Sequence, residues 1–172
     1  MEFLYHGTHT LNGVNIARTG AILSPWYQKI ERLERLFEKK PEAKKRFFEE
    51  IYPGKNISEM ALIMASDGFG AHDIEHRVKS VSVSKDKSRT DHYGTRFDNS
   101  RGGGIVLALE ITPEIKRILH DGWEKATIIF IPGKLQLESL RQVHLSPRCM
   151  KDSMGFVQKE FERYNPEYFI IS

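Results

Sequence analysis

The sequence predicts a mixed α+β fold, for three reasons. Segments with the alternating polar and apolar pattern of β-strands occur near both ends of the chain and through its second half. Apolar residues at helical spacing dominate a charged stretch between the first two of these segments. No repeat, linker or low-complexity segment divides the 172 residues, so we expect one domain, 1–172, with a helical insertion at about 26–65.

The first half of the chain is predicted to contain a strand followed by helices. Residues 2–8 alternate well enough for a strand, and a glycine stops the short helix expected over 12–17. Apolar residues recur at helical spacing over 26–51, which predicts an amphipathic helix or a helix pair broken near Pro41. A weaker helix is expected over 58–65.

The second half is predicted to be mostly strand. The expected strands comprise residues 78–84, 105–111, 127–131, 143–145 and 168–171. Short helices are expected between them at residues 88–93, 113–119 and 152–164. In the first of these strands serines alternate with valines, so we expect a shared face, open to solvent or lining a cleft, for Ser80, Ser82 and Ser84.

Composition restricts the compartment and the partners. A single cysteine cannot form an internal disulfide, and no N-terminal segment resembles a signal peptide, so we expect a cytoplasmic protein. No apolar run approaches the roughly 18 residues that span a bilayer, so we expect no membrane partner. The 26 Lys and Arg against 23 Asp and Glu permit an acidic or nucleic-acid partner without requiring one.

Two short segments carry residue types suited to binding a small molecule. In His6-Gly7-Thr8, the imidazole can form a hydrogen bond, and the glycine lets a ligand come close to the backbone. Thr90 and Tyr93 lie three residues apart on a predicted helical turn and therefore point the same way. A hydroxyl beside an aromatic ring suits a flat heteroaromatic amide, because one forms a hydrogen bond and the other stacks.

These segments resemble the ADP-ribosyltransferase superfamily, in particular its branch of poly(ADP-ribose) polymerases and diphtheria toxin. Residues 4–12 (LYHGTHTLN), continuing through Ile16 and Gly20, resemble the family opening L-x-H-G-[ST]-x-x-x-N-x-x-x-I-x-x-x-G. Residues 82–93 are similar to the strand and helix that complete the family's nicotinamide pocket. The resemblance implies a split antiparallel β-sheet core, with the helical insertion after the first strand-helix unit, and NAD as the co-substrate.

The resemblance also implies a role for individual residues. Gly7 would hold the nicotinamide amide through its backbone, Thr90 would donate its hydroxyl to that amide, and Tyr93 would stack on the ring. His6 would hold the adenine-side ribose. Ser82 stands where the His-Tyr-Glu branch has a tyrosine, and its Ser-Val-Ser strand is closer to the toxins' Ser-Thr-Ser, so the implied triad is a hybrid of His6, Ser82 and Tyr93. The implied cofactor-binding set is completed by Thr8, Asn12 and Ser84.

Two positions compete for the catalytic acid of this family. Glu167 starts an apolar strand, as in the polymerases, but the family fold has another strand after the glutamate strand. Gln142 stands where the toxin-like pattern Glu-Val-x-Leu places the acid, and it leaves one more strand to follow. Glutamine carries no negative charge to stabilise an oxocarbenium-like state. Glu138, within a Gln-x-Glu sequence, is a third candidate.

No bound metal is expected. His72 and His76 have the i, i+4 spacing of zinc ligands on a helix. Asp73 follows the first histidine where a zinc protease carries glutamate, and the sequence offers no third ligand.

The resemblance implies a mono-ADP-ribosyltransferase that cleaves NAD at the nicotinamide–ribose bond and modifies a protein or nucleic-acid acceptor. We expect a monomer, and an intracellular toxin, a phage-encoded modifier and an injected effector all fit. One alternative is a module that binds NAD, ADP-ribose or a partner without transfer; another is a transferase acting on 2'-phosphorylated RNA ends. A phosphate backbone or the NAD pyrophosphate would suit the cations that flank the pocket, Lys85, Lys87, Arg89, Arg96 and Arg101.

Overall fold

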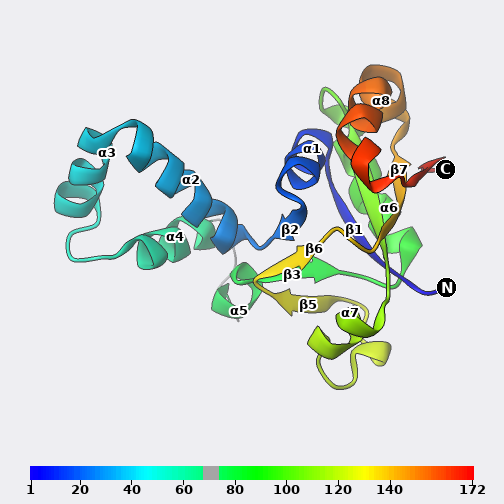
Figure 1. Ribbon diagram of the computed structural model, residues 1–172, viewed down its shortest axis with the longest axis horizontal. Coiled ribbons are helices and arrows are strands. Elements are labelled where there is room, and N and C mark those ends of the chain that lie inside the picture. Colours follow the sequence, from blue (N-terminus) through cyan, green and yellow to red (C-terminus); the bar gives the residue numbers. More distant parts are fainter. Residues whose placement is uncertain (68–73) are drawn as a thin grey trace. The chain divides into compact units, whose positions relative to one another are not determined.

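The computed structural model describes residues 1–67 and 74–172, and the chain divides into two compact units (Figure 1). The first unit comprises Met1–Ile22, Ser82–Ile131 and Leu135–Ser172. The second comprises Leu23–Val81 and Pro132–Lys134. The stretch expected as an insertion, 26–65, therefore lies wholly within the second unit.

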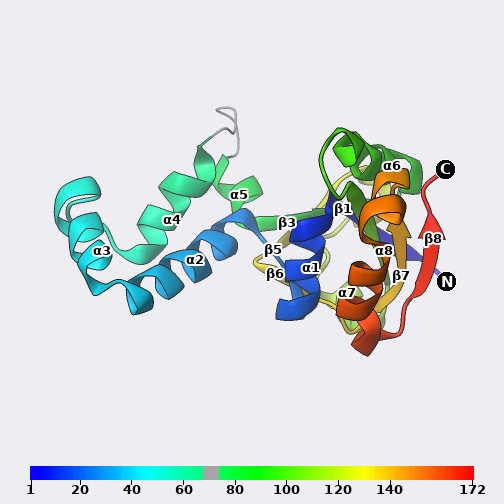
Figure 2. The same ribbon diagram turned by 90° about the horizontal axis from the view of Figure 1, so that it is seen from above.

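A four-stranded sheet forms the centre of the first unit. Its strands, in spatial order, are β1 (Phe3–His9), β4 (Gly104–Glu110), β7 (Leu140–Leu145) and β8 (Glu167–Ile170). The first two pairings are antiparallel and the third is parallel, and Figure 2 shows β8 at the edge of the sheet beside β7. Residues 105–109 of β4 are fully buried, as expected for a central strand covered on both faces.

Helices cover both faces of this sheet. Those that contact it are α1 (Thr10–Thr19), α6 (Lys87–Thr95) and α8 (Pro147–Phe161). A Cβ added to Gly13 would lie 2.2 Å from Ile105 Cδ1, so α1 packs closely on the Ile105 face of β4. A Cβ added to Gly94 would lie 3.1 Å from Val106 Cγ2, so α6 packs on the Val106 face. Consecutive strand residues point to opposite faces, so the sheet lies between these two helices.

Shorter elements complete the first unit. Its short helices are η2 (Arg96–Asn99), α7 (Pro113–Ile118), η3 (Trp123–Lys125) and η4 (Glu162–Tyr164). Short strands also pair in two ladders, β2 (Ala21–Leu23) with β6 (Lys134–Gln136) and β3 (Ser80–Val83) with β5 (Ile129–Pro132). Wherever the chain continues from one unit into the other, it does so within β2, β3, β5 or β6.

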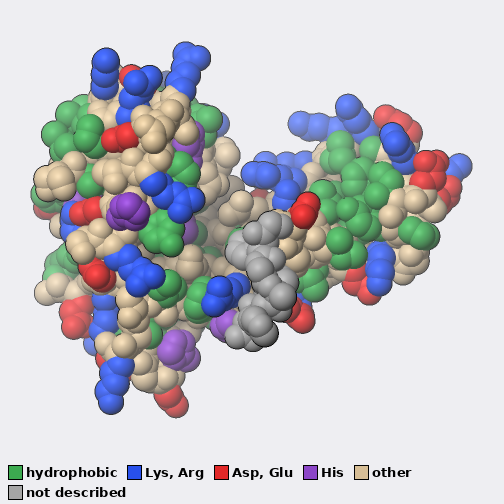
Figure 3. Space-filling view, turned by 180° about the vertical axis from the view of Figure 1, so that it is seen from behind, with side chains coloured by type: hydrophobic (Ala, Val, Ile, Leu, Met, Phe, Trp, Pro, Cys, Tyr) green, Lys and Arg blue, Asp and Glu red, His purple; other side chains and the backbone are tan. Residues whose placement is uncertain are grey.

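The second unit is helical. Its elements are α2 (Pro25–Lys39), α3 (Pro41–Arg46), the π-helical η1 (Phe47–Ile51), α4 (Ile57–Ser66) and α5 (Ile74–Val78). Pro41 begins α3, which confirms the predicted helix pair and its break. The core of the unit is formed by Leu33, Phe37, Met60 and Ala61. Figure 3 shows that hydrophobic side chains also gather on one face of this unit, among charged ones.

The α+β class predicted from the sequence is confirmed, but one expectation about a strand face was wrong. Ser80 and Ser84 are buried, with 3% and 6% of their surface exposed, whereas Ser82 is exposed. The buried position of Ser84 is explained by its hydroxyl, which donates to the Thr127 carbonyl at 2.8 Å.

In the described ranges 1–67 and 74–172, no helix is long and apolar enough to cross a membrane.

Candidate functional site

The free edge of β1 meets the end of β3, and this contact brings the two sequence motifs together. The backbone N–H of Tyr5 donates to the Ser84 carbonyl at 2.7 Å, and that of Ser84 donates to the Tyr5 carbonyl at 3.0 Å. One residue further along β1, His6 Nδ1 lies 2.9 Å from the Ser82 carbonyl oxygen. A carbonyl only accepts hydrogen bonds, so the proton lies on Nδ1 and leaves Nε2 as an acceptor.

The surroundings of His6 keep its ring neutral. Burial lowers the pKa of His6 below its ordinary value of 6.5, and the bond to the Ser82 carbonyl offsets this only in part. The imidazole is therefore neutral at pH 7. Its Nε2 can then accept a hydrogen bond from a hydroxyl group, such as that of a ribose.

α6 packs tightly on β1 at Gly7. A Cβ added to Gly7 would lie 2.9 Å from Tyr93 Cβ and 3.0 Å from the Thr90 carbonyl oxygen. Contacts this short force a backbone to shift, so the glycine lets the helix pack where it does. The structure thus brings His6-Gly7 and the Thr90/Tyr93 pair, which lie far apart in the sequence, against each other.

The backbone of Gly7 presents a donor and an acceptor at this place. Alternate residues of a strand direct their N–H and C=O groups to the same edge. Tyr5 uses these groups on Ser84, so those of Gly7 point along the same edge, away from β4. Among residues 1–67 and 74–172, none forms a hydrogen bond with Gly7 on that edge. A planar amide could form hydrogen bonds with the N–H and C=O of Gly7, as a neighbouring strand would.

The two α6 side chains at Gly7 differ in what they offer a ligand. The Tyr93 side chain is 41% exposed, whereas Thr90 is 4% exposed. The Thr90 hydroxyl donates to the Asp86 carbonyl at 2.9 Å, within its own helix. Its hydrogen is therefore used within the helix, and the role of amide donor that the resemblance implies for Thr90 stays a prediction. Tyr93 keeps an open aromatic surface.

The remaining residues implied in cofactor binding mostly form bonds within the fold. Asn12 Nδ2 donates to Thr8 Oγ1 at 2.7 Å, which ties the first turn of α1 to the end of β1. The Ser84 hydroxyl is likewise engaged, since it donates to the Thr127 carbonyl. Among Thr8, Asn12, Ser82 and Ser84, only Ser82 is exposed. The geometry gives Thr8, Asn12 and Ser84 structural roles that need no ligand.

The candidate acids lie across the sheet from this pocket. Gln142 on β7 and Glu167 on β8 are paired neighbours, and β4 separates both strands from β1. Neighbouring strands lie about 4.8 Å apart, so β7 lies roughly 10 Å from β1 and β8 roughly 14 Å from it. In the described part of the chain, no hydrogen bond, ion pair or ring contact joins Gln142 or Glu167 to His6 or Tyr93. Glu138 lies in the turn between β6 and β7, and no bond in the described part of the chain links it to the pocket.

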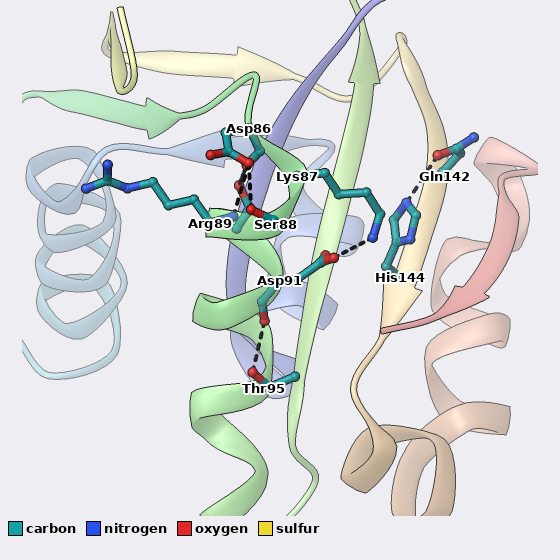
Figure 4. A network of polar contacts seen from close by, with 9 residues as sticks. Asp86, Lys87, Ser88, Arg89, Asp91, Thr95, Gln142 and His144 are labelled. Carbon is teal, nitrogen blue, oxygen red and sulfur yellow. Dashed lines mark hydrogen bonds and ion pairs between the residues drawn. The ribbon is translucent and has the colours of Figure 1, made fainter. Parts of the chain in front are cut away.

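Gln142 belongs instead to a polar cluster beside α6 (Figure 4). Lys87 and Asp91 form an ion pair at 2.5 Å on α6 and point toward β7, where His144 Nε2 donates to Gln142 Oε1 at 3.1 Å. The His144 ring stacks on Phe169 of β8, with 5.1 Å between centroids. Two buried atoms of the cluster, Asp91 Oδ1 and His144 Nδ1, have no hydrogen-bond partner among the described residues.

The histidine of this cluster has a strongly perturbed pKa. Burial lowers the pKa of His144 from 6.5 to about 4, and the positive charge of Lys87 adds to the effect, whereas Asp91 opposes it. The ring is therefore neutral at pH 7. Sequence reasoning singled out Gln142 but missed His144 and Asp91. The alternation of Gln142 and His144 on one face of a strand is the signal that could have found the cluster.

The histidine pair and the single cysteine do not form a further site in the described part of the chain. His72 lies outside the described residues. Within residues 1–67 and 74–172, no group of three or more His, Cys, Asp or Glu side chains could hold a metal ion. Cys149 is buried, and burial raises the pKa of its thiol, which disfavours the reactive thiolate.

Comparison with known proteins finds similarity among solved structures. No protein-family model matches the chain, and no curated protein matches it. The chain is similar to Thermosipho africanus DarTG in complex with ADP-ribose, at 12% identity and a TM-score of 0.49, over 99% of this chain and 50% of that chain. It is also similar to Thermus sp. 2.9 DarT in complex with ADP-ribosylated ssDNA, at 11% identity and a TM-score of 0.48, over 98% of this chain and 93% of that chain. The chain thus spans about half the length of the Thermosipho protein.

Proposed function

We propose that this chain is an ADP-ribosyltransferase that cleaves NAD at the nicotinamide–ribose bond and transfers a single ADP-ribose to a protein or nucleic-acid acceptor. The observation that carries the proposal is the junction at Gly7, where α6 packs on β1 and places the exposed Tyr93 next to a residue with a free backbone edge. Both segments that resemble the ADP-ribosyltransferase superfamily contribute to this one place.

Each group at the Gly7 junction has a counterpart on the nicotinamide riboside half of NAD. The N–H and C=O of Gly7 complement the carboxamide, which has both a donor and an acceptor. The ring of Tyr93 offers a stacking surface for the pyridinium. Nε2 of the neutral His6 accepts from a ribose hydroxyl. Together these contacts hold the leaving group and the ribose in one orientation, which promotes cleavage through positioning.

Cleavage also needs negative charge near the ribose, because the sugar becomes oxocarbenium-like as nicotinamide leaves. Of the two main candidates, Glu167 carries a carboxylate and Gln142 does not. In the described part of the chain, no carboxylate is hydrogen-bonded or ion-paired to His6, Ser82 or Tyr93. This favours a second candidate function, a module that binds NAD or ADP-ribose at the Gly7 junction without transferring it.

Two measurements on the same preparation separate these functions. NAD binding is measured by calorimetry, and nicotinamide release is measured by chromatography after incubation of labelled NAD with a mixed lysate. The transferase is expected to show both binding and release, with label transferred to an acceptor. The binding module is expected to show binding without release. A folded protein that binds neither NAD nor ADP-ribose would contradict both functions.

Replacement of the stacking ring is expected to weaken NAD binding. Tyr93→Ala should lower the affinity about tenfold or more, because loss of a stacked ring costs roughly 1–3 kcal/mol. The matched control is Tyr27→Ala, because Tyr27 is exposed to a similar extent, 38% against 41% for Tyr93, and lies on α2 of the second unit. Equal NAD affinity in the wild type and Tyr93→Ala would count against the pocket.

A further inference from the structure

We propose that Arg96 binds an esterified phosphate group of the ligand that occupies the Gly7 junction, an inference that rests on the proposed function. Arg96 follows α6 directly, at the start of η2. Its guanidinium carbon lies 5.1 Å from the centroid of the Tyr93 ring and 5.0 Å from that of the Phe97 ring. Because a planar guanidinium stacks favourably on aromatic faces, these two rings restrict its orientation.

The N–H groups of Arg96 are not taken up by other residues. In the described part of the chain, its guanidinium has no hydrogen bond and no ion pair, and its contacts are the two rings. The neighbouring carboxylate of Asp98 instead accepts the backbone N–H of Arg148, at 3.4 Å. Arg96 therefore combines a restricted orientation with a free planar fork of donors, which matches phosphate oxygens in pairs.

The two lysines near the pocket are already engaged. Lys87 is paired with Asp91 at 2.5 Å. The Lys85 ammonium donates to the Glu124 carbonyl and lies 5.2 Å from the centroid of the Trp123 ring. Binding a phosphate through either lysine would require these contacts to break, whereas Arg96 loses no polar partner.

Arg96 also lies between two features that suit an anionic nucleotide. Tyr93, on one side of it, contacts Gly7, and Phe97, on the other, meets the ring of His9 edge-on at 5.5 Å. His9 is the N-cap of α1, so the positive end of that helix dipole begins at the same place. A phosphate near Arg96 is therefore attracted both by the guanidinium and by the start of α1.

Two sources could supply such a phosphate. In NAD, the pyrophosphate follows the nicotinamide ribose, so it is the next charged group beyond a ring stacked on Tyr93. A nucleic-acid acceptor carries the same chemistry in its phosphodiester backbone. Both sources present tetrahedral anionic oxygens that arginine binds in a bidentate manner.

The test compares ligands with and without phosphate on the wild type, Arg96→Gln and Arg96→Lys. ADP-ribose and a short single-stranded oligonucleotide contain phosphate, and their affinities are measured by calorimetry. Nicotinamide contains none, and its binding is measured by ligand-observed NMR. Arg117→Gln is the matched control, because Arg117 is an exposed arginine on α7 with no aromatic contact in the described part of the chain.

Arg96→Gln is expected to weaken the binding of ADP-ribose, of the oligonucleotide or of both by about tenfold or more, since a hydrogen bond to a charged group contributes about 1.5–3 kcal/mol. The ligand that loses affinity identifies the source of the phosphate. The affinities of Arg96→Lys are expected to lie between those of the wild type and Arg96→Gln, because lysine keeps the charge but not the planar fork. Nicotinamide binding by Arg96→Gln is expected to stay unchanged, as are all affinities of Arg117→Gln.

Three outcomes would overturn the inference. If Arg96→Gln bound both phosphate ligands as tightly as the wild type, the inference about Arg96 would be overturned. The proposed function would still stand in that case, provided that the wild type binds nicotinamide. A parallel loss of nicotinamide and ADP-ribose binding would assign Arg96 to support of the Tyr93 ring. A folded wild type that binds none of the three ligands would overturn the proposed function together with this inference.

Discussion

Gly7→Ala is expected to displace α6 from β1, to lower the free energy of unfolding by about 1–3 kcal/mol and to abolish measurable NAD binding. The added methyl group would lie 2.9 Å from Tyr93 Cβ and 3.0 Å from the Thr90 carbonyl oxygen. The second of these is a backbone atom, so the clash is relieved only by moving the helix. That movement separates the Tyr93 ring from the free edge of β1. Denaturant unfolding and calorimetric titration with NAD measure the two effects.

Gly155→Ala is the matched control for this variant. Gly155 lies within α8, and a Cβ added there meets nothing within 4 Å. Alanine is favoured over glycine inside a helix by roughly 0.5–1 kcal/mol, so the control should be neutral or slightly more stable. If Gly7→Ala matched Gly155→Ala in stability and kept its NAD affinity, the close packing of α6 on β1 would be contradicted.

Acid is expected to destabilise the protein through His144. Its pKa falls on folding from 6.5 to about 4, so between these pH values the unfolded chain binds more protons than the folded chain. Stability from this group is therefore fully present above about pH 6.5 and is lost as the pH falls toward 4. The loss amounts to about 3 kcal/mol. Denaturant unfolding at a series of pH values between 7 and 4 measures it.

The contribution of His144 is isolated by comparing how the free energy of unfolding changes with pH in the wild type and in a variant without this histidine. His144→Gln keeps a polar side chain of similar size next to Gln142 but does not titrate, so its stability should depend less steeply on pH over this range. His92→Gln is the control, because His92 is an exposed histidine on α6. A wild type and a His144→Gln variant with the same pH dependence would show that His144 is not held neutral by burial.

Local chemistry explains what could be predicted from the sequence. The β1 strand, the helix pair broken at Pro41 and the α6 helix follow from alternation, helical spacing and proline, which act over a few residues. The pairing of His6-Gly7 with Thr90 and Tyr93 followed from the family resemblance. The structure adds its physical basis, a glycine at which a strand and a helix touch.

The rest depended on contacts that local patterns do not encode. Gln142 and Glu167 both follow family-like patterns, and only the strand order, with β4 between them and β1, separates them from the pocket. Ser84 belongs to an alternating polar strand, but a distant carbonyl, that of Thr127, takes up its hydroxyl and accounts for its burial. Arg96 stood among several basic residues in the sequence, and its two aromatic contacts distinguish it only in three dimensions.

An NMR titration that follows backbone amides tests whether the free edge of β1 at Gly7 holds the nicotinamide of NAD. Nicotinamide is added to isotope-labelled protein, and the amide resonances of Gly7 and of residues remote from the junction are compared. We expect a saturable shift of the Gly7 amide as its N–H gains a hydrogen bond, with loss of that shift in Tyr93→Ala. A Gly7 resonance that stays unchanged at saturating nicotinamide, in a folded protein, would contradict it.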